Sequence, residues 1–178
     1  MAQSTFQGPV RSLSGFISQG PNAVAAISTA TATLTVAGYA GKIINVTAAT
    51  TTITLPAVNA SANPVSSGPG QDPNTLNNLG ATYTFFVPAT ATAIKIITGT
   101  GDYLLGQVII GIDATTPAGS IVMFAADGST IRSLNLNGTT KGGIAGSFVT
   151  IVATAANTYM VYGKLIGSGT LATPFATS

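Results

Sequence analysis

Residues 38–56 read GYAGKIINVTAATTTITLP, and this stretch decides the fold class. It contains two short runs, residues 42–46 and 52–55, and apolar side chains alternate with polar ones through the second run and most of the first. Successive side chains of a β-strand point to opposite faces, so this alternation predicts strands with one buried and one exposed face. A small Ala/Thr connector separates the two runs, and we interpret the pair as a β-hairpin.

The rest of the chain repeats this pattern, with Thr, Ile, Val and Phe alternating between breaks at Gly, Asn or Asp. One or two helical turns could follow Asn22, but no long helix is predicted. Asp127-Gly128 predicts a hairpin turn, and a second hairpin is predicted around Asn157 with Tyr159 and Val161 on one face. We expect an all-β protein, an antiparallel β-sandwich or roll of about seven to nine short strands. Besides the two runs above, the segments with a strand-like pattern, from which these strands would be drawn, are residues 29–36, 81–87, 91–98, 103–112, 121–125, 130–134, 147–154 and 158–165.

We divide the chain into an extended N-terminal arm, residues 1–30, a β-domain, residues 31–166, and an extended C-terminal tail, residues 167–178. A long loop rich in Pro, Gly and Asn covers residues 56–79 of the domain. The apolar residues of the arm follow no helical or strand period. A frayed terminus is the common fate of such a segment. An arm that docks on a partner is the alternative, because it would bury these side chains, which are Phe6, Val10, Phe16 and Ile17.

The predicted strand at residues 103–112 is too uniformly apolar for a strand on the surface. Val108, Ile109 and Ile110 are consecutive, so both faces of the strand carry large apolar side chains. Strands of this kind are covered on both faces. We therefore expect these three residues in the core or in a subunit interface.

The chain is apolar and nearly uncharged: 46% of its 178 residues are hydrophobic and 6% are charged, where a globular domain has about 25% charged residues. Its surface must consist of uncharged polar residues or be covered by partners, and both favour a structural protein that assembles. The six basic residues stand singly, so we expect no nucleic-acid partner. No stretch has the character of a signal peptide or a bilayer span, so we expect neither secretion nor a membrane partner.

The sequence offers little for catalysis, because it has no His, Cys or Glu. Two aspartates could in principle cleave a glycoside, and one could contribute to a calcium site. Each of the four precedes or follows turn residues, however, where Asp shapes a turn by bonding nearby backbone. We predict no enzyme, no catalytic residue, no cofactor and no metal. The four aspartates are Asp72, Asp102, Asp113 and Asp127.

Five aromatic residues could form a platform on which a sugar stacks, but their alternation along predicted strands favours packing in the core or an interface. They are Tyr83, Phe85, Phe86, Tyr159 and Tyr162.

Several segments in succession resemble a β-module recurrent in virion proteins of tailed bacteriophages. They are GKIINV at 41–46, TTITLP at 51–56, GATYTFFV at 80–87, SFVTIV at 147–152 and TYMVYG at 158–163. The resemblance covers residues 33–163, and the order of the segments carries it. Such modules occur in capsid cement or decoration proteins and in tail fibres or spikes.

The resemblance implies a decoration protein that binds the outside of the phage head as a homotrimer and stabilises contacts between major capsid proteins. It would be made in the host cytoplasm and located on the outer surface of the virion capsid. On this hypothesis the arm docks on the shell through Phe6, Val10, Phe16 and Ile17, and Arg11 pairs with a capsid carboxylate. The alternative is a receptor- or glycan-binding module of a tail fibre or spike.

Overall fold

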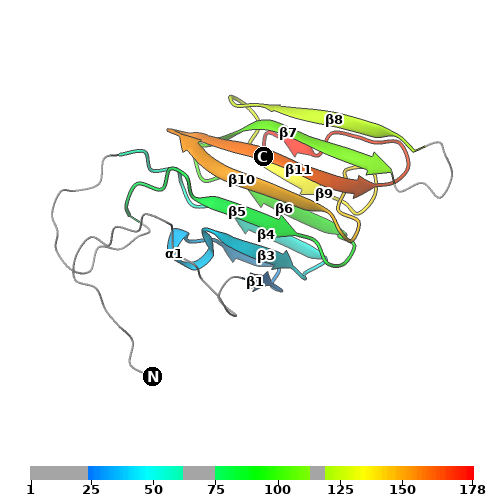
Figure 1. Cartoon of the computed structure of the whole chain (residues 1–178), viewed down its shortest axis with the longest axis horizontal. Helices are drawn as coiled ribbons and strands as arrows, with labels where there is room; N and C mark the ends of the chain where they lie inside the picture. Colours follow the sequence, from blue (N-terminus) through cyan, green and yellow to red (C-terminus); the bar gives the residue numbers. More distant parts are fainter. Residues whose placement is uncertain (1–23, 62–74, 113–118) are drawn as a thin grey trace, which may run out of the picture.

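A computed structural model describes residues 24–61, 75–112 and 119–178 (Figure 1). Within these ranges the chain forms twelve strands and one short helix. The elements are β1 (Val24–Ile27), β2 (Thr31–Thr33), α1 (Val36–Tyr39), β3 (Lys42–Val46), β4 (Thr50–Thr54), β5 (Thr82–Phe86), β6 (Ala93–Ile97), β7 (Tyr103–Ile112), β8 (Ile121–Asp127), β9 (Ser133–Leu136), β10 (Phe148–Ala155), β11 (Thr158–Gly167) and β12 (Phe175–Ala176).

The strands form two sheets that pack face to face, so the all-β prediction is confirmed. One sheet has seven strands in the order β1-β3-β5-β10-β11-β7-β8, and the other has five in the order β12-β9-β6-β4-β2. Figure 1 looks onto the seven-stranded sheet, with strands of the second sheet behind it. Both sheets are mixed, with parallel pairs such as β3/β5 and β4/β6 beside antiparallel ones. The predicted antiparallel pairing therefore holds only for part of the sandwich.

The first six strands form three stacked β-arches, in which the chain crosses from one sheet to the other. In β1–β2, β3–β4 and β5–β6, the first strand belongs to the seven-stranded sheet and the second to the five-stranded sheet. Corresponding strands of successive arches pair in parallel. The predicted hairpin at residues 38–56 is therefore wrong: β3 and β4 face each other across the core and do not share a sheet.

The connectors of the arches bond to the neighbouring arch. The backbone N–H of Thr47 and its hydroxyl both donate to the carbonyl oxygen of Ile27, at 2.9 and 3.1 Å. The backbone N–H of Thr92 donates to the carbonyl of Ala49 at 2.7 Å. A hairpin turn would satisfy these groups within itself, whereas here the stack satisfies them.

Two further local predictions are wrong. Residues 24–27, which were compatible with helical turns, form strand β1, because pairing with β3 outweighs the helix propensity of Ala. The Asp127-Gly128 turn does not join a hairpin, since β8 lies in the seven-stranded sheet and β9 in the other. The chain crosses between the sheets after Asp127, and β8 pairs with β7.

The C-terminal hairpin is confirmed. Strands β10 and β11 pair in antiparallel fashion, and Asn157 at their turn has the left-handed φ of 59°. The alternation predicted Tyr159 and Val161 on one face and Met160 and Tyr162 on the other. The first pair points into the core and the second is exposed. After β11, the predicted tail folds back and adds β12 to the edge of the five-stranded sheet beside β9.

The loop predicted at residues 56–79 is described at its two ends. Asn59 and Asn78 clamp them together: the backbone N–H of Asn59 donates to the Asn78 side-chain oxygen at 2.8 Å, and the Asn78 amide donates to the carbonyl of Ala57 at 2.8 Å. Residues 62–74 lie outside the described part.

The core fills the space between the sheets with the inward-facing side chains of both. Val108 and Ile110 of β7 are fully buried there, in the first of the two positions, core or subunit interface, that were predicted for them. Ile109, between them, points to the opposite side of the sheet and is partly exposed. The largest fully buried side chains include Tyr83, Tyr159, Phe85, Ile44, Ile53, Ile94 and Leu104.

Candidate functional site

The outer face of the seven-stranded sheet carries most of the exposed large apolar residues. Of the eleven such residues in the described part, nine lie on this face by their register, and the other two are Leu79 and Val122. We call these nine residues the apolar face. They are Val24, Ile43, Phe86, Leu105, Ile121, Met123, Phe148, Met160 and Tyr162.

A continuous row crosses the middle of this face. Phe86 of β5 is in register with Phe148 of β10, Phe148 with Lys164 of β11, Lys164 with Ile109 of β7, and Ile109 with Met123 of β8. Residues in register on neighbouring strands have side chains in contact range. The row therefore presents a nearly unbroken apolar surface over five strands, with one charge in it.

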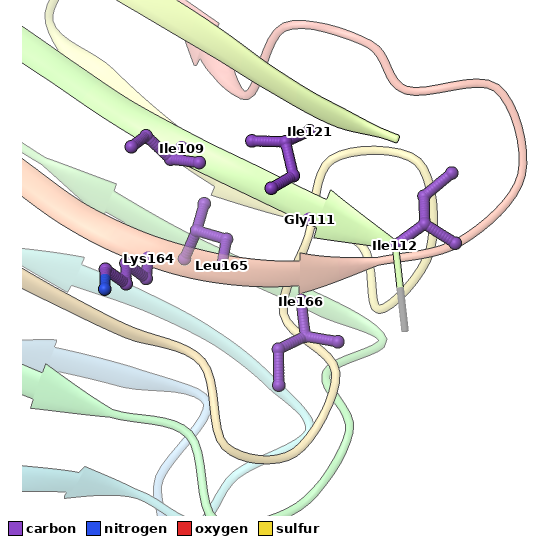
Figure 2. Close-up of a pocket in the computed structure, with 7 residues that line it drawn as sticks. All are labelled: Ile109, Gly111, Ile112, Ile121, Lys164, Leu165 and Ile166. Carbon is purple, nitrogen blue, oxygen red and sulfur yellow. The ribbon is translucent and has the colours of Figure 1, made fainter. Parts of the chain in front are cut away.

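A groove of about 660 Å³ opens at the β8 end of this face. Figure 2 shows that its lining comes from β7, β8 and β11, with Ile109, Ile121 and Ile166 among the side chains. A second hollow, next to it, is lined by Phe148, Tyr162 and again Ile109 and Lys164. Lys164 is the only charged residue among the lining residues of both hollows.

The outer face of the five-stranded sheet has the opposite character. Thr31, Thr52, Lys95 and Asn135 are in register across its four adjacent strands β2, β4, β6 and β9. Eight of the twelve residues that line a hollow of about 420 Å³ on this face are polar, among them Lys141. The sandwich thus has one apolar and one polar outer face.

The two described aspartates have structural roles. The carboxylate of Asp127 accepts hydrogen bonds from the backbone N–H groups of Ser129, Thr130 and Ile131 and from the Thr130 hydroxyl, which confirms its predicted turn. The bond from the Thr130 hydroxyl, supported by these N–H groups, lowers the pKa of Asp127 well below its usual range. Asp72 and Asp113 lie outside the described residues.

The prediction that the Asp102 side chain bonds the backbone of its own turn is wrong. Its carboxylate accepts a hydrogen bond from the backbone N–H of Val58. Burial raises the pKa of Asp102, although the bond from Val58 and the charge of Arg132 act in the opposite direction. The described residues contain no group of three or more His, Cys, Asp or Glu that could hold a metal ion.

The aromatic residues do not form a common platform. Tyr83, Phe85 and Tyr159 are buried in the core, as the packing interpretation predicted, while Phe86 and Tyr162 belong to the apolar face. Burial raises the pKa of Tyr83 to about 12. It also raises the pKa of Tyr159, and the nearby Tyr83 and Asp102 raise it further.

The predicted site residues have different outcomes. The arm residues Phe6, Val10, Arg11, Phe16 and Ile17 lie outside the described part, so their proposed contacts stay a prediction. Ile109 was predicted, with Val108 and Ile110, to lie in the core or in a subunit interface. Of these three residues, it alone lines the groove. The row from Phe86 to Met123 was missed, because it depends on which strands pair.

Comparisons of the chain with protein-family models, with curated proteins and with solved structures find no match. In the part of the chain that the structure describes, no helix is both long enough and apolar enough to cross a membrane. What the fold and the surface define is thus an all-β sandwich with an apolar face of one sheet open for contact.

Proposed function

We propose that this chain is a structural protein of a tailed-phage virion, which decorates the outside of the head as a homotrimer and stabilises contacts between major capsid proteins. The observation that carries the proposal is the contrast between the two outer faces of the sandwich. Contiguous apolar patches larger than a few hundred Å² are rare on monomers and mark interaction sites. A protein that lies between a shell and solvent needs one face of each kind.

The apolar face supplies the free energy of docking by being removed from water. A row of Phe86, Phe148, Ile109 and Met123 supplies large side chains, and such anchors dominate binding energy when they are fully desolvated. Lys164, in the middle of the row, requires a carboxylate or carbonyl partner on the shell once it is buried. In this proposal Phe6, Val10, Arg11, Phe16 and Ile17 of the arm add contacts with the same shell.

This mode of binding suits a capsid under internal pressure. To open, the shell would have to separate the apolar contacts in addition to those of the major capsid protein itself. Apolar interfaces depend little on ionic strength, because no long-range charge attraction is screened. The reinforcement would therefore persist at high salt.

The test uses particles that lack this protein, to which purified protein is added back. Wild-type protein is expected to bind the particles and to raise the temperature at which they open. Phe148→Ser should bind at least about tenfold more weakly, since it removes a central anchor of the row. Ile97→Ser is the control, because it removes an apolar residue from the outer face of the other sheet. Particles that open at the same temperature with and without the protein would contradict the proposal.

A second candidate function is a receptor- or glycan-binding module of a tail fibre or spike. It is favoured by the polar hollow on the five-stranded sheet, where Thr52, Lys95 and Asn135 offer donors and acceptors to hydroxyl groups. Binding to host glycans that is lost in Asn135→Ala and retained in Phe148→Ser would favour this function. Electron cryomicroscopy of the virion separates the two, with density over the head lattice in one case and at the tail in the other.

A further inference from the structure

Strand β8 is an open edge of the seven-stranded sheet. Its only neighbour among the described strands is β7. Three consecutive residues of β8 are exposed although they are large and apolar: Ile121 at 77%, Val122 at 37% and Met123 at 59%. Among the described residues, nothing pairs with the outer backbone edge of β8 or covers these side chains.

The hydrogen bonds at the two ends of the β7–β8 pair show which backbone groups face outward. The N–H of Ile112 donates to the carbonyl of Ser120, and the N–H of Gly128 donates to the carbonyl of Leu104. In an antiparallel pair every second residue bonds to the neighbouring strand. The even-numbered residues of β8 therefore bond to β7, and the N–H and C=O groups of its odd-numbered residues 121, 123 and 125 point to the open edge.

Apart from the charged Asp127 at its end, the described part of this edge lacks the devices that keep natural sheets from pairing. Charged side chains, prolines and bulges usually block an exposed edge. Residues 121–126 read IVMFAA, without charge or proline. The register between β7 and β8 runs without a shift from Leu105↔Asp127 to Gly111↔Ile121, so no bulge turns the edge away.

We propose that a second copy of this chain pairs with this edge, so that the two β8 strands run antiparallel about a two-fold axis. The register that uses all three outward-facing residues places Met123 opposite its own counterpart and Ile121 opposite Ala125 of the second copy. The two-fold axis adds the pair of Ala125 with Ile121 of the second copy. The three pairs would exchange about six hydrogen bonds. The two seven-stranded sheets then become one continuous sheet.

The properties of β8 favour its own copy as the occupant. Pairing about a two-fold axis brings apolar residues against apolar residues and requires no second complementary surface. In this register Asp127 lies opposite Gly119 of the second copy, so the two carboxylates sit at opposite ends and do not repel each other. The apolar face would continue across the contact, because residues in register lie on the same face.

The contact does not depend on the proposed role in a capsid, but it is compatible with it. Trimers at local three-fold positions of a lattice meet across local two-fold axes, which is where this pairing would link them. An edge contact buries less than the roughly 1,200–2,000 Å² of a stable interface, so it should be weak in solution. Many such contacts on one lattice would act together.

Cysteine cross-linking tests the contact directly, because the natural chain contains no Cys. Met123→Cys should form a disulfide between two copies on mild oxidation, since opposite Cα atoms of a hydrogen-bonded pair lie about 5.5 Å apart, within the range of a disulfide. Met160→Cys is the control: it is exposed on the same face, but its strand β11 is not at an edge. It should give no cross-link.

A charge at the edge provides a second readout on the non-covalent contact. In sedimentation experiments, wild-type protein is expected to show a species of doubled mass as its concentration rises. Met123→Lys should abolish this species, whereas Met160→Lys should leave it. The proposal is overturned if Met160→Cys cross-links as readily as Met123→Cys, or if folded Met123→Cys gives no dimer at the highest soluble concentration. Neither experiment involves phage particles, so its outcome is independent of the proposed function.

Discussion

The carboxylate of Asp102 accepts a hydrogen bond from the backbone N–H of Val58, with 2.9 Å between oxygen and nitrogen. The bond ties the segment after β4 to the turn between β6 and β7. Asp102 is buried, and burial raises the pKa of its carboxyl group. The same side chain therefore fixes a loop and holds a charge in an unfavourable environment.

Asp102→Asn should be at least as stable as the wild type near neutral pH, because an amide oxygen can accept the Val58 bond without a buried charge. Asp102→Ala should lower the free energy of unfolding by about 1–3 kcal/mol, since Val58 N–H loses its partner. Urea unfolding of the two variants and the wild type measures both effects.

The pH dependence gives the control. An acid with a higher pKa in the folded state stabilises the fold most at low pH, and this contribution is lost as the pH rises through the folded pKa. The advantage of Asp102→Asn over the wild type should therefore be larger near pH 7 than near about pH 3. An equal advantage at both pH values would contradict the account of a buried charge.

Gly106 is required by a close approach between β7 and β11. It has a φ of 134°, and a Cβ atom there would lie 2.2 Å from the carbonyl oxygen of Val161. Gly106→Ala is expected to lower the free energy of unfolding by about 2–4 kcal/mol through strain and displacement of β11. Gly111→Ala, in the same strand, has open space around its Cβ and should change stability by less than about 1 kcal/mol. Thermal unfolding of the two variants compares them, and similar losses in both would show that strand propensity and not the contact is responsible.

Two buried tyrosines differ in one hydrogen bond. The hydroxyl of Tyr159 donates to the carbonyl oxygen of Pro56 at 2.7 Å, whereas the buried hydroxyl of Tyr83 has no partner among the described residues. Tyr159→Phe should lower the free energy of unfolding by about 1–1.5 kcal/mol, and Tyr83→Phe should leave it unchanged or raise it. Chemical denaturation measures the pair. A larger loss in Tyr83→Phe would reveal a partner for its hydroxyl, such as a buried water molecule.

Local patterns predicted the faces of the strands but not their partners. The alternation in Ile44 and Val46, and again in Ile53 and Leu55, places these side chains on one face of each strand. A hairpin and an arch share this alternation, so the sequence cannot say whether the two apolar faces lie side by side or oppose each other. The bonds that decide it, such as Thr47 to Ile27, come from another arch.

The same limit applies to the candidate site. That Met160 and Tyr162 lie on the face opposite to Tyr159 was predictable, because their hairpin is local and its alternation is clear, but which of the two faces is exposed was not. The row that joins Phe86, Phe148 and Ile109 depends on pairings between strands that are remote in the sequence. The low fraction of charged residues predicted that some surface would be apolar or covered, but it could not locate that surface.

Asp127 should show a pH dependence opposite to that of Asp102. Its carboxylate accepts three backbone N–H bonds and a hydroxyl bond at the point where the chain crosses from β8 to β9, and these bonds lower its pKa. A lowered pKa stabilises the fold above the unfolded value of about 3.9 and loses this effect as the pH falls toward the folded value. Asp127→Ala should therefore be less stable than the wild type near neutral pH, and the difference should shrink in acid. Asp127→Asn should lie between the two, because it can accept N–H bonds but carries no charge. Thermal unfolding of the three proteins across the acid range measures this, and a difference for Asp127→Ala that grows toward low pH would refute the role assigned to this turn.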